Sequence, residues 1–68
     1  MKNTIKVERA KKELTQADLA ERVGVSRQTI NSIEKGRFIP STLLALKIAR
    51  VFEVAVDSIF ALEPEDWN

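Results

Sequence analysis

Residues 14–36 read LTQADLAERVGVSRQTINSIEKG, and this stretch decides how the chain folds. It contains two short amphipathic patterns, each preceded by a residue that can cap a helix. Thr15 stands at the N-cap of the first pattern, with an acid three residues later, and Ser26 stands at the N-cap of the second. Gly24 and Gly36 follow the two patterns and supply the left-handed residue with which helices commonly end. Two short helices joined by a tight turn are therefore predicted.

The second of these helices carries polar side chains that contribute little to a core. At about 100° per residue, Ile30 and Ile33 fall on one side of the helix, together with Ser26 and Thr29, and we expect this side to be buried. Glu34 falls at the border of that side. The outward stripe consists of Gln28, Asn31, Ser32 and Lys35, with Arg27 at its edge.

The remaining patterns predict an all-α fold. A wide apolar face over residues 42–52 predicts a central core helix, and shorter patterns predict helices over about 5–12 and 56–60. Ile5 and Val7 also alternate as in a strand, but a helix is favoured there. The predicted division is a compact five-helix domain at 5–60, which contains the helix-turn-helix at 16–35, followed by a frayed acidic tail at 61–68.

The charge of the chain is divided along its length. Of 68 residues, 44% are hydrophobic and 31% are charged, which is typical of a folded globular domain. The first 52 residues hold all 11 basic side chains against five acids, a net charge of plus 6, whereas the last 16 hold five acids and no base. One part of the chain is therefore suited to a polyanion and the other is not.

Several classes of protein are disfavoured by what the sequence lacks. There is no histidine, cysteine or tyrosine to act as a base, a nucleophile or a metal ligand, so we expect no enzyme, no metal site and no cofactor. A domain of this size has little room for a small-molecule ligand. No unbroken apolar run is longer than Leu43–Leu46, too short to cross a membrane. A cytoplasmic protein without a membrane partner is expected.

The outward stripe has the residue types that read base pairs in double-stranded DNA. Glutamine can bond an adenine edge with both amide atoms, arginine does likewise with guanine, and asparagine resembles glutamine with a shorter reach. A helix that follows a short turn and is polar outward is also the arrangement that enters the major groove. An ordinary amphipathic helix exposes polar residues too, so the prediction depends on the stripe, the caps, the turn and the basic charge occurring together. Phosphate contacts are expected from residues that flank the stripe, namely Thr15, Gln16, Lys35 and Arg37.

The segment LTQADLAERVGVSRQTINSIEKGRFIP resembles the phage repressor and Cro type of helix-turn-helix regulators, often called the Xre family. The resemblance covers about residues 5–60 and includes the LTQ opening, the LAERVGVS turn, RQTI, IEKG and the closing V-x-V-D-x-I-F. It implies a five-helix DNA-binding transcriptional regulator that acts as a dimer, as a repressor, on a partly palindromic operator.

The resemblance also implies roles for particular residues. The main base contacts would come from Arg27 and Gln28, with Asn31 and Ser32 further along the groove. The phosphate at the start of the preceding helix would be held by Gln16. Arg9 would form a structural ion pair with Glu34, which agrees with the position of Glu34 at the border of the core.

The sequence departs from the family's pattern at four positions. Glu13 stands where glycine is usual, and Glu53 stands where glycine or asparagine is often found. Ala55 stands where a helix cap is usual, and Glu8 stands at a position that is often apolar. A residue other than glycine in the left-handed conformation costs on the order of 1 kcal/mol. We therefore expect the first and fourth helices to end differently from those of the family.

A single module of this size buries only about 600 to 1,000 Å² on DNA, which rarely suffices for tight binding, so we expect a homodimer. The candidate interface residues, each of which could instead belong to the core, are Leu43, Leu46, Phe60, Leu62 and Trp67. Two rival functions stay open: an antitoxin whose partner toxin covers the acidic C-terminal end, and a small coactivator that bridges proteins without contacting bases.

Overall fold

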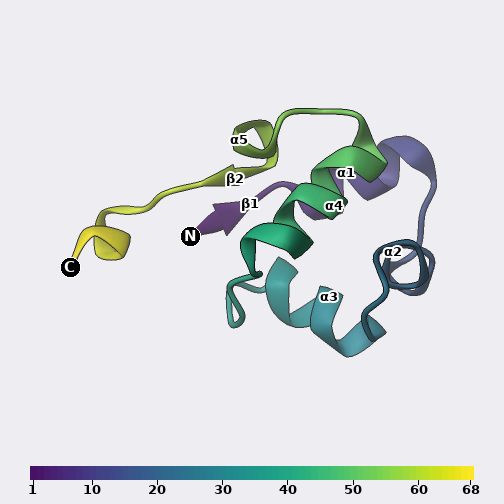
Figure 1. The fold of residues 1–68 in the computed structure, drawn as a ribbon, viewed down its shortest axis with the longest axis horizontal. Helices are drawn as coiled ribbons and strands as arrows, with labels where there is room; N and C mark the ends of the chain where they lie inside the picture. The colour runs from purple at the N-terminus through teal and green to yellow at the C-terminus, as the bar shows by residue number, and fades with distance from the viewer.

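Five short α-helices make up most of the chain, and the computed structural model describes all residues from 1 to 68 (Figure 1). This confirms the all-α, five-helix fold predicted from the helix signals. None of these helices has both the length and the apolar character needed to span a bilayer. The helices are α1 (Ile5–Lys12), α2 (Gln16–Val23), α3 (Arg27–Glu34), α4 (Thr42–Phe52) and α5 (Val56–Ile59).

Side-chain caps start three of the helices, and two of these caps, Thr15 and Ser26, were predicted. Thr15 Oγ1 accepts a hydrogen bond from the backbone N–H of Asp18 at 3.0 Å, and the Asp18 carboxylate accepts one from the N–H of Thr15 at 3.0 Å, which completes a capping box. Ser26 Oγ accepts from the N–H of Thr29 at 3.1 Å, and Ser41 Oγ accepts from the N–H of Leu44 at 3.1 Å. Ser26 itself is exposed, so its expected place on the buried side was wrong: a cap lies outside the helix that it starts.

Two segments far apart in the sequence form a short antiparallel sheet that was not predicted. Strand β1 (Lys2–Asn3) pairs with β2 (Phe60–Ala61), with Lys2 opposite Ala61 and Asn3 opposite Phe60. The strand therefore precedes α1 rather than replacing its first turn, and α5 ends at Ile59, one residue earlier than expected. The side chain of Asn3 extends the link, because its Nδ2 donates to the carbonyl of Ile33 at 2.9 Å.

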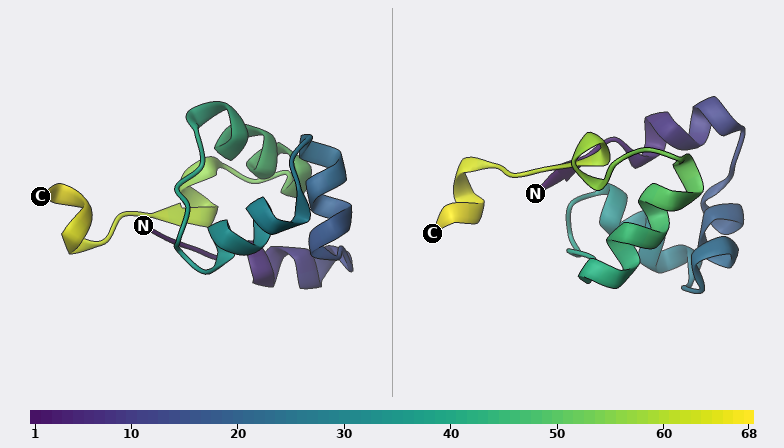
Figure 2. Two further views of the ribbon diagram at one scale, coloured as in Figure 1. Left: turned by 90° about the horizontal axis from the view of Figure 1, so that it is seen from below. Right: turned by 45° about the horizontal axis from the view of Figure 1, so that its top comes forward.

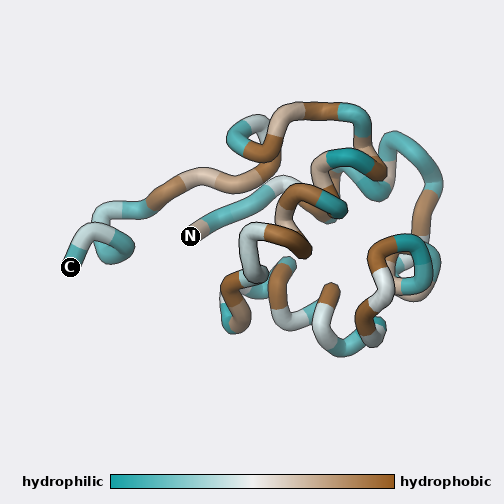
Figure 3. The backbone as a smooth tube through the Cα atoms, viewed as in Figure 1, coloured by the Kyte–Doolittle hydropathy of each residue, from teal (hydrophilic) through white to brown (hydrophobic).

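Every helix contributes buried residues to the hydrophobic core. Figure 3 shows hydrophobic and hydrophilic residues succeeding each other along the helices, as amphipathic packing requires. Phe60 belongs to this core, with 8% of its surface exposed, so its expected place at a dimer interface was wrong. Its pairing with Asn3 in the sheet holds it there. The side chains that are almost completely buried are those of Ile5, Leu19, Ile30, Ile33 and Ile48.

Helices α1 and α4 end on left-handed residues although neither residue is glycine. Glu13 has φ 55° and Glu53 has φ 57°. Backbone N–H groups at these positions close the ends: Glu13 donates to the carbonyl of Ala10 at 3.2 Å, and Glu53 donates to that of Arg50 at 3.1 Å. The expectation that these ends are shaped differently was wrong, because the backbone hydrogen bonds and packing maintain a conformation that costs about 1 kcal/mol.

The C-terminal segment is held by the other end of the chain and is not the frayed tail expected from its composition. Residues Pro64–Trp67 form a 3-10 helix, η1, which extends away from the helical body (Figures 1 and 2). The amino group of Met1 lies 2.9 Å from Asp66 Oδ2 and 3.1 Å from Glu63 Oε1. These contacts raise the pKa of the Met1 amine, with the bond to Asp66 the larger cause.

Candidate nucleic-acid interface

Helices α2 and α3 form the predicted helix-turn-helix. Gly24, with φ 77°, ends α2, and its N–H donates to the carbonyl of Ala20 at 2.9 Å; the N–H of Val25 donates to the same carbonyl at 3.0 Å. Helix α3 then starts at the Ser26 cap. Ile30 and Ile33 are completely buried on its inner side, which places the opposite side of α3 on the surface of the molecule.

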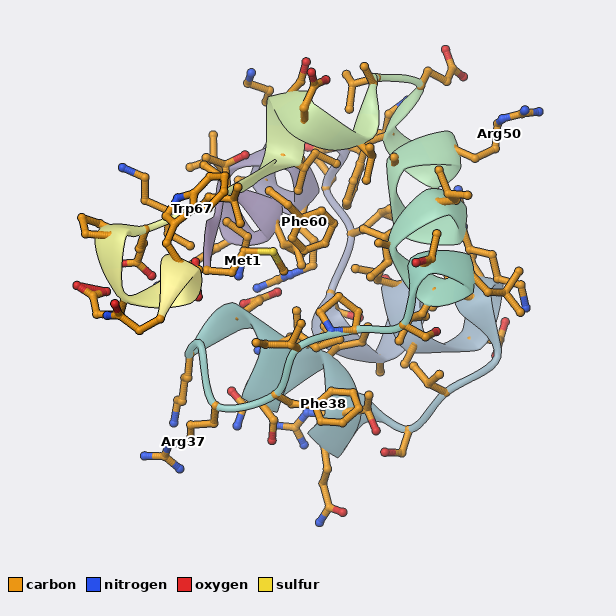
Figure 4. All side chains as sticks on the ribbon, turned by 60° about the vertical axis from the view of Figure 1, so that its left-hand side comes forward. Met1, Arg37, Phe38, Arg50, Phe60 and Trp67 are labelled. Atoms are coloured by element: carbon orange, nitrogen blue, oxygen red, sulfur yellow. The ribbon has the colours of Figure 1, made fainter.

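The side chains of the two residues at the start of α3 form no hydrogen bond or ion pair within the chain. These residues, Arg27 and Gln28, are both exposed. Lys35 and Arg37, just beyond the end of α3, are exposed as well, and Figure 4 shows Arg37 pointing away from the body of the molecule. Ser32 is half-buried, and its carbonyl accepts from the N–H of Arg37 at 2.9 Å. Both ends of α3 therefore present polar or basic side chains that have no partner within the chain.

An ion pair lies beneath α3 and joins it to α1. Arg9 Nε donates to Glu34 Oε2 at 2.7 Å, and Arg9 Nη2 donates to Glu34 Oε1 at 3.1 Å. The third guanidinium nitrogen, Nη1, donates to the carbonyl of Leu14 at 2.9 Å. Only 8% of the Glu34 side chain is exposed. The hydrogen bonds to Glu34 raise the pKa of Arg9. The pair joins the end of α3 to α1 through two N–H···O bonds.

Gln16 and Asn31 meet at the same place. Gln16 Nε2 lies 3.2 Å from Asn31 Oδ1 and 3.2 Å from Glu34 Oε1. Both side chains are half-buried. The structure therefore connects two residues that the sequence assigned to different tasks, a phosphate contact and a base contact, through one network with Arg9 and Glu34.

The start of α2 faces an open depression. Its volume is about 610 Å³, and its lining includes Thr15, Gln16, Ala17 and Arg27. The backbone N–H groups of Gln16 and Ala17 are in the first turn of α2, where no intrahelical acceptor exists. The residues that carry these two N–H groups therefore line one hollow with the basic Arg27 and the acidic Glu13. Free N–H groups at the start of a helix are suited to an anion.

Phe38 is a surface residue that the sequence reasoning missed. It is 48% exposed and lines a shallow depression of about 210 Å³ with Gln28, Thr29 and Ser32 (Figure 4). Phe38 lies in the loop after Gly36, so the direction of its side chain cannot be predicted from helical periodicity. The signal that could have found it is an aromatic residue next to the basic Arg37.

The other candidate interface residues are exposed but lie on two different elements. Leu43 and Leu46 are on the outer face of α4, where they line a depression with Arg22, Lys47 and Arg50. Leu62 and Trp67 are on the C-terminal segment, and Trp67 is 76% exposed. Figure 4 shows the contrast with Phe60, which points into the body of the molecule beside Met1.

Comparison with known proteins agrees with this architecture. A family model described as helix-turn-helix matches residues 5–59. An HTH-type transcriptional regulator of Methanocaldococcus jannaschii is 53% identical over 66 residues, covering 97% of this chain and all of that protein.

Two solved structures are also similar. The N-terminal DNA binding domain of SinR from Bacillus subtilis matches with a TM-score of 0.75 and 30% identity, and the match covers 88% of each chain. The clp gene regulator ClgR from Corynebacterium glutamicum matches with a TM-score of 0.74 and 28% identity; the match covers 79% of this chain and 57% of that one. The chain therefore belongs to the helix-turn-helix family of the phage repressor and Cro type, whose relatives are named as transcriptional regulators.

Proposed function

We propose that this protein is a sequence-specific DNA-binding transcriptional regulator that acts as a dimeric repressor and reads the major groove with α3. The observation that carries the proposal is the exposure of the Arg27 and Gln28 side chains. Both are exposed and unpaired at the start of a helix whose inner side is anchored by Ile30 and Ile33. Side chains of these two types on a rigid helix are suited to paired hydrogen bonds with guanine and adenine edges.

The base contacts are assigned to Arg27, Gln28, Asn31 and Ser32, in the order in which α3 presents them. Phe38 borders Gln28 and Ser32, and its ring is suited to an apolar contact with a thymine methyl group. The assignment makes α3 and the start of the following loop a single reading surface.

The phosphate contacts are assigned to two regions that flank this surface. Thr15 and Gln16 lie at the start of α2, beside free backbone N–H groups, and Lys35 and Arg37 lie past the end of α3. Phosphate contacts of this kind set the position of the protein on the duplex and carry no sequence information directly. The net charge of plus 6 over residues 1–52 supports the same orientation, with the acidic C-terminal segment away from the DNA.

A dimer follows from the small area that one module can bury on DNA. Leu43, Leu46, Leu62 and Trp67 are the exposed apolar side chains proposed for its interface. Two recognition helices in such a dimer lie about 34 Å apart, so the operator is proposed to be partly palindromic, with half-sites centred about 10 base pairs from each other. Bound in the cytoplasm to an operator within a promoter, the dimer would exclude the transcription machinery.

Selection of bound duplexes from a random pool tests the proposal. We expect enrichment of a partly palindromic sequence with the half-site spacing given above. Binding without enrichment of any sequence would reject a base-reading function, and no binding at all would favour a protein-binding module such as an antitoxin or a coactivator. Enrichment of one half-site without its symmetric copy would reject the dimeric form alone.

A further inference from the structure

We infer that residues 62–68 of one copy dock on the outer face of α4 in a second copy, and that this contact, made in both directions, holds the dimer together. The inference rests on the dimer of the proposed function and states which parts of the two copies meet. It follows from two exposed surfaces of the chain that are complementary in polarity and in charge.

The first surface is a depression of about 390 Å³ on the outer face of α4. Leu43 and Leu46 line it and are 65% and 53% exposed. Its charged lining residues are all basic, namely Arg22, Lys47 and Arg50. All three are exposed, and none forms an ion pair within the chain; Figure 4 shows Arg50 pointing away from the body of the molecule. The depression therefore combines an apolar lining with unpaired positive charge.

The second surface is the segment at residues 62–68, which has the opposite charge. It contains three acids and no base. Leu62 and Trp67 are 60% and 76% exposed. Glu65 is exposed as well, and its side chain forms no hydrogen bond or ion pair within the chain. The segment therefore presents a leucine and a large aromatic ring beside unpaired negative charge.

The segment does not reach the depression of its own chain. The pairing of β2 with β1 and the contact between the Met1 amine and Asp66 set the direction in which the segment leaves the helical body. Figure 1 shows η1 at one end of the long axis of the molecule and α2, the helix that carries Arg22, at the other. The molecule extends 34 Å along that axis. The surface that covers Trp67 therefore belongs to a different molecule.

A second copy supplies a surface of matching chemistry. The indole ring of Trp67 is suited to an apolar depression bordered by cations, because the face of an aromatic ring attracts positive charge. Glu65, two residues earlier, then lies against the same basic border. Tryptophan and arginine are also enriched among the residues that dominate the binding energy of interfaces. Complementary charge guides the approach of two partners and fixes their register.

Symmetry makes the contact twice. Each copy carries one segment and one depression, so a two-fold arrangement fills both depressions and leaves no further docking site open. Neither surface includes a residue of α3, because the depression is formed by α2 and α4 and the segment follows β2. The dimer formed in this way therefore leaves Arg27 and Gln28 free for DNA.

An exchange of charge between the two surfaces tests the inference. Lys47→Glu with Arg50→Glu gives the depression two acids, and Glu65→Lys with Asn68→Lys gives the segment two bases. Each double variant should dimerise at least about 10-fold more weakly than the unmodified chain, because the attraction between the surfaces is then lost or reversed. An equal mixture of the two variants should form a heterodimer at least about 10-fold more tightly than either variant dimerises with itself, since both contacts again join opposite charges. Sedimentation equilibrium of the full chains measures these dissociation constants.

A control and a second readout accompany this experiment. Lys6→Glu with Lys12→Glu changes the net charge by the same amount at exposed positions of α1, and should alter the dissociation constant by no more than about 2-fold. The emission of Trp67 should shift to shorter wavelength as the unmodified chain dimerises, because the ring leaves water. The shift should disappear in the variant with the acidic depression, although its segment is unchanged.

Three results would overturn the inference. Unchanged dimerisation of the variant with the acidic depression would show that the outer face of α4 receives nothing. A mixture that assembles no more tightly than its components would show that the two surfaces do not meet. Assembly of the unmodified chain beyond the dimer would replace the two-fold exchange by an open chain.

Failure of the inference can be told apart from failure of the proposed function. A chain that stays monomeric but still selects one duplex sequence would remove the dimer and this contact together, and would leave the depression to an acidic partner of another kind. The base-reading function would stand in that case. A chain that dimerises by the charge exchange but selects no sequence would support the contact and reject the proposed function alone.

Discussion

Arg9 on α1 and Glu34 at the end of α3 are joined by two hydrogen bonds, at 2.7 and 3.1 Å, and this pair links α1 to the helix that carries the proposed reading surface. Both groups are mostly removed from water, with 15% of the Arg9 side chain and 8% of the Glu34 side chain exposed. The pair therefore serves the site without belonging to it. Loss of the Arg9–Glu34 pair should lower the stability of the fold. DNA binding should weaken only because fewer molecules are then folded.

We expect Arg9→Met to lower the free energy of unfolding by about 3 kcal/mol, because it leaves the carboxylate of Glu34 buried without its partner. The double variant Arg9→Met with Glu34→Leu should recover most of this loss, since no uncompensated charge remains. Urea unfolding of the three proteins measures both effects. Glu8→Ala is a matched control on α1. Glu8 pairs with Lys11 at 3.3 Å, but the Lys11 side chain is largely exposed, so the free energy of unfolding should change little. Equal losses for Arg9→Met and Glu8→Ala would contradict the structural role of the buried pair.

Gln28→Ala and Lys35→Ala should weaken DNA binding in different ways. Gln28 is assigned to a base, so its truncation should remove preference at one or two base pairs, worth about 1 to 3 kcal/mol, and leave weak general binding intact. Lys35 is assigned to a phosphate, so its truncation should weaken binding to every sequence and reduce the slope of log affinity against log salt by about one unit. Titrations with the selected operator and with mutated operators, at several salt concentrations, distinguish the two. A uniform loss for Gln28→Ala would remove it from the base contacts.

Ala55→Ser should stabilise the protein. Ala55 occupies the N-cap of α5 with φ −70° and ψ 150°, the backbone conformation of a cap, but it has no side-chain acceptor. A serine there can accept from the free N–H groups of the first turn and should add about 0.5 to 1 kcal/mol, or roughly 2 to 8 °C in melting temperature for a domain of this size. Ala61→Ser, at an exposed position in β2, is the control for the hydroxyl itself. An increase shared by both variants would mean that the gain is not a cap.

The C-terminal segment should be docked only within a window of pH. Hydrogen bonds to Asp66 and Glu63 raise the pKa of the Met1 amine above 8.0, so their contribution is present below that value and is lost as the pH rises through the raised pKa. The pKa of Asp66 is lowered from 3.8, first by the N–H of Glu63 and then by the Met1 amine, so its contribution is lost as the pH falls. Docking should therefore be strongest between about pH 4 and 8.

Trp67 reports this docking directly, because it is the only tryptophan and lies in η1. Its fluorescence anisotropy should fall outside that window, while circular dichroism of the helices changes little. Asp66→Asn should lower the anisotropy at neutral pH, whereas Glu65→Gln, which lacks these contacts, should not. Anisotropy that follows global unfolding at every pH would show that the segment does not undock by itself.

The caps of α2 and α3 and the end of α2 were predictable because their causes lie within four residues of each other. Thr15 with Asp18, Ser26 with Thr29, and Gly24 could be assigned from spacing alone, and the structure confirms each assignment. The periodicity of α3 separated its buried side from its polar stripe for the same reason. The assignments of base and phosphate contacts remain predictions.

The contacts between residues far apart along the chain could be found only from the tertiary structure. The pairing of Asn3 with Phe60, and of the Met1 amine with Asp66, turned an expected frayed tail into a docked segment and an expected interface residue into core. The bond between Gln16 and Asn31 likewise depends on the angle at which α2 meets α3. The sequence by itself determined the local elements, since hydrogen bonds within one helical turn need no information from elsewhere. The bond between α2 and α3 and the place of the chain ends were decided by packing, because only the assembled core brings those distant groups within hydrogen-bonding distance.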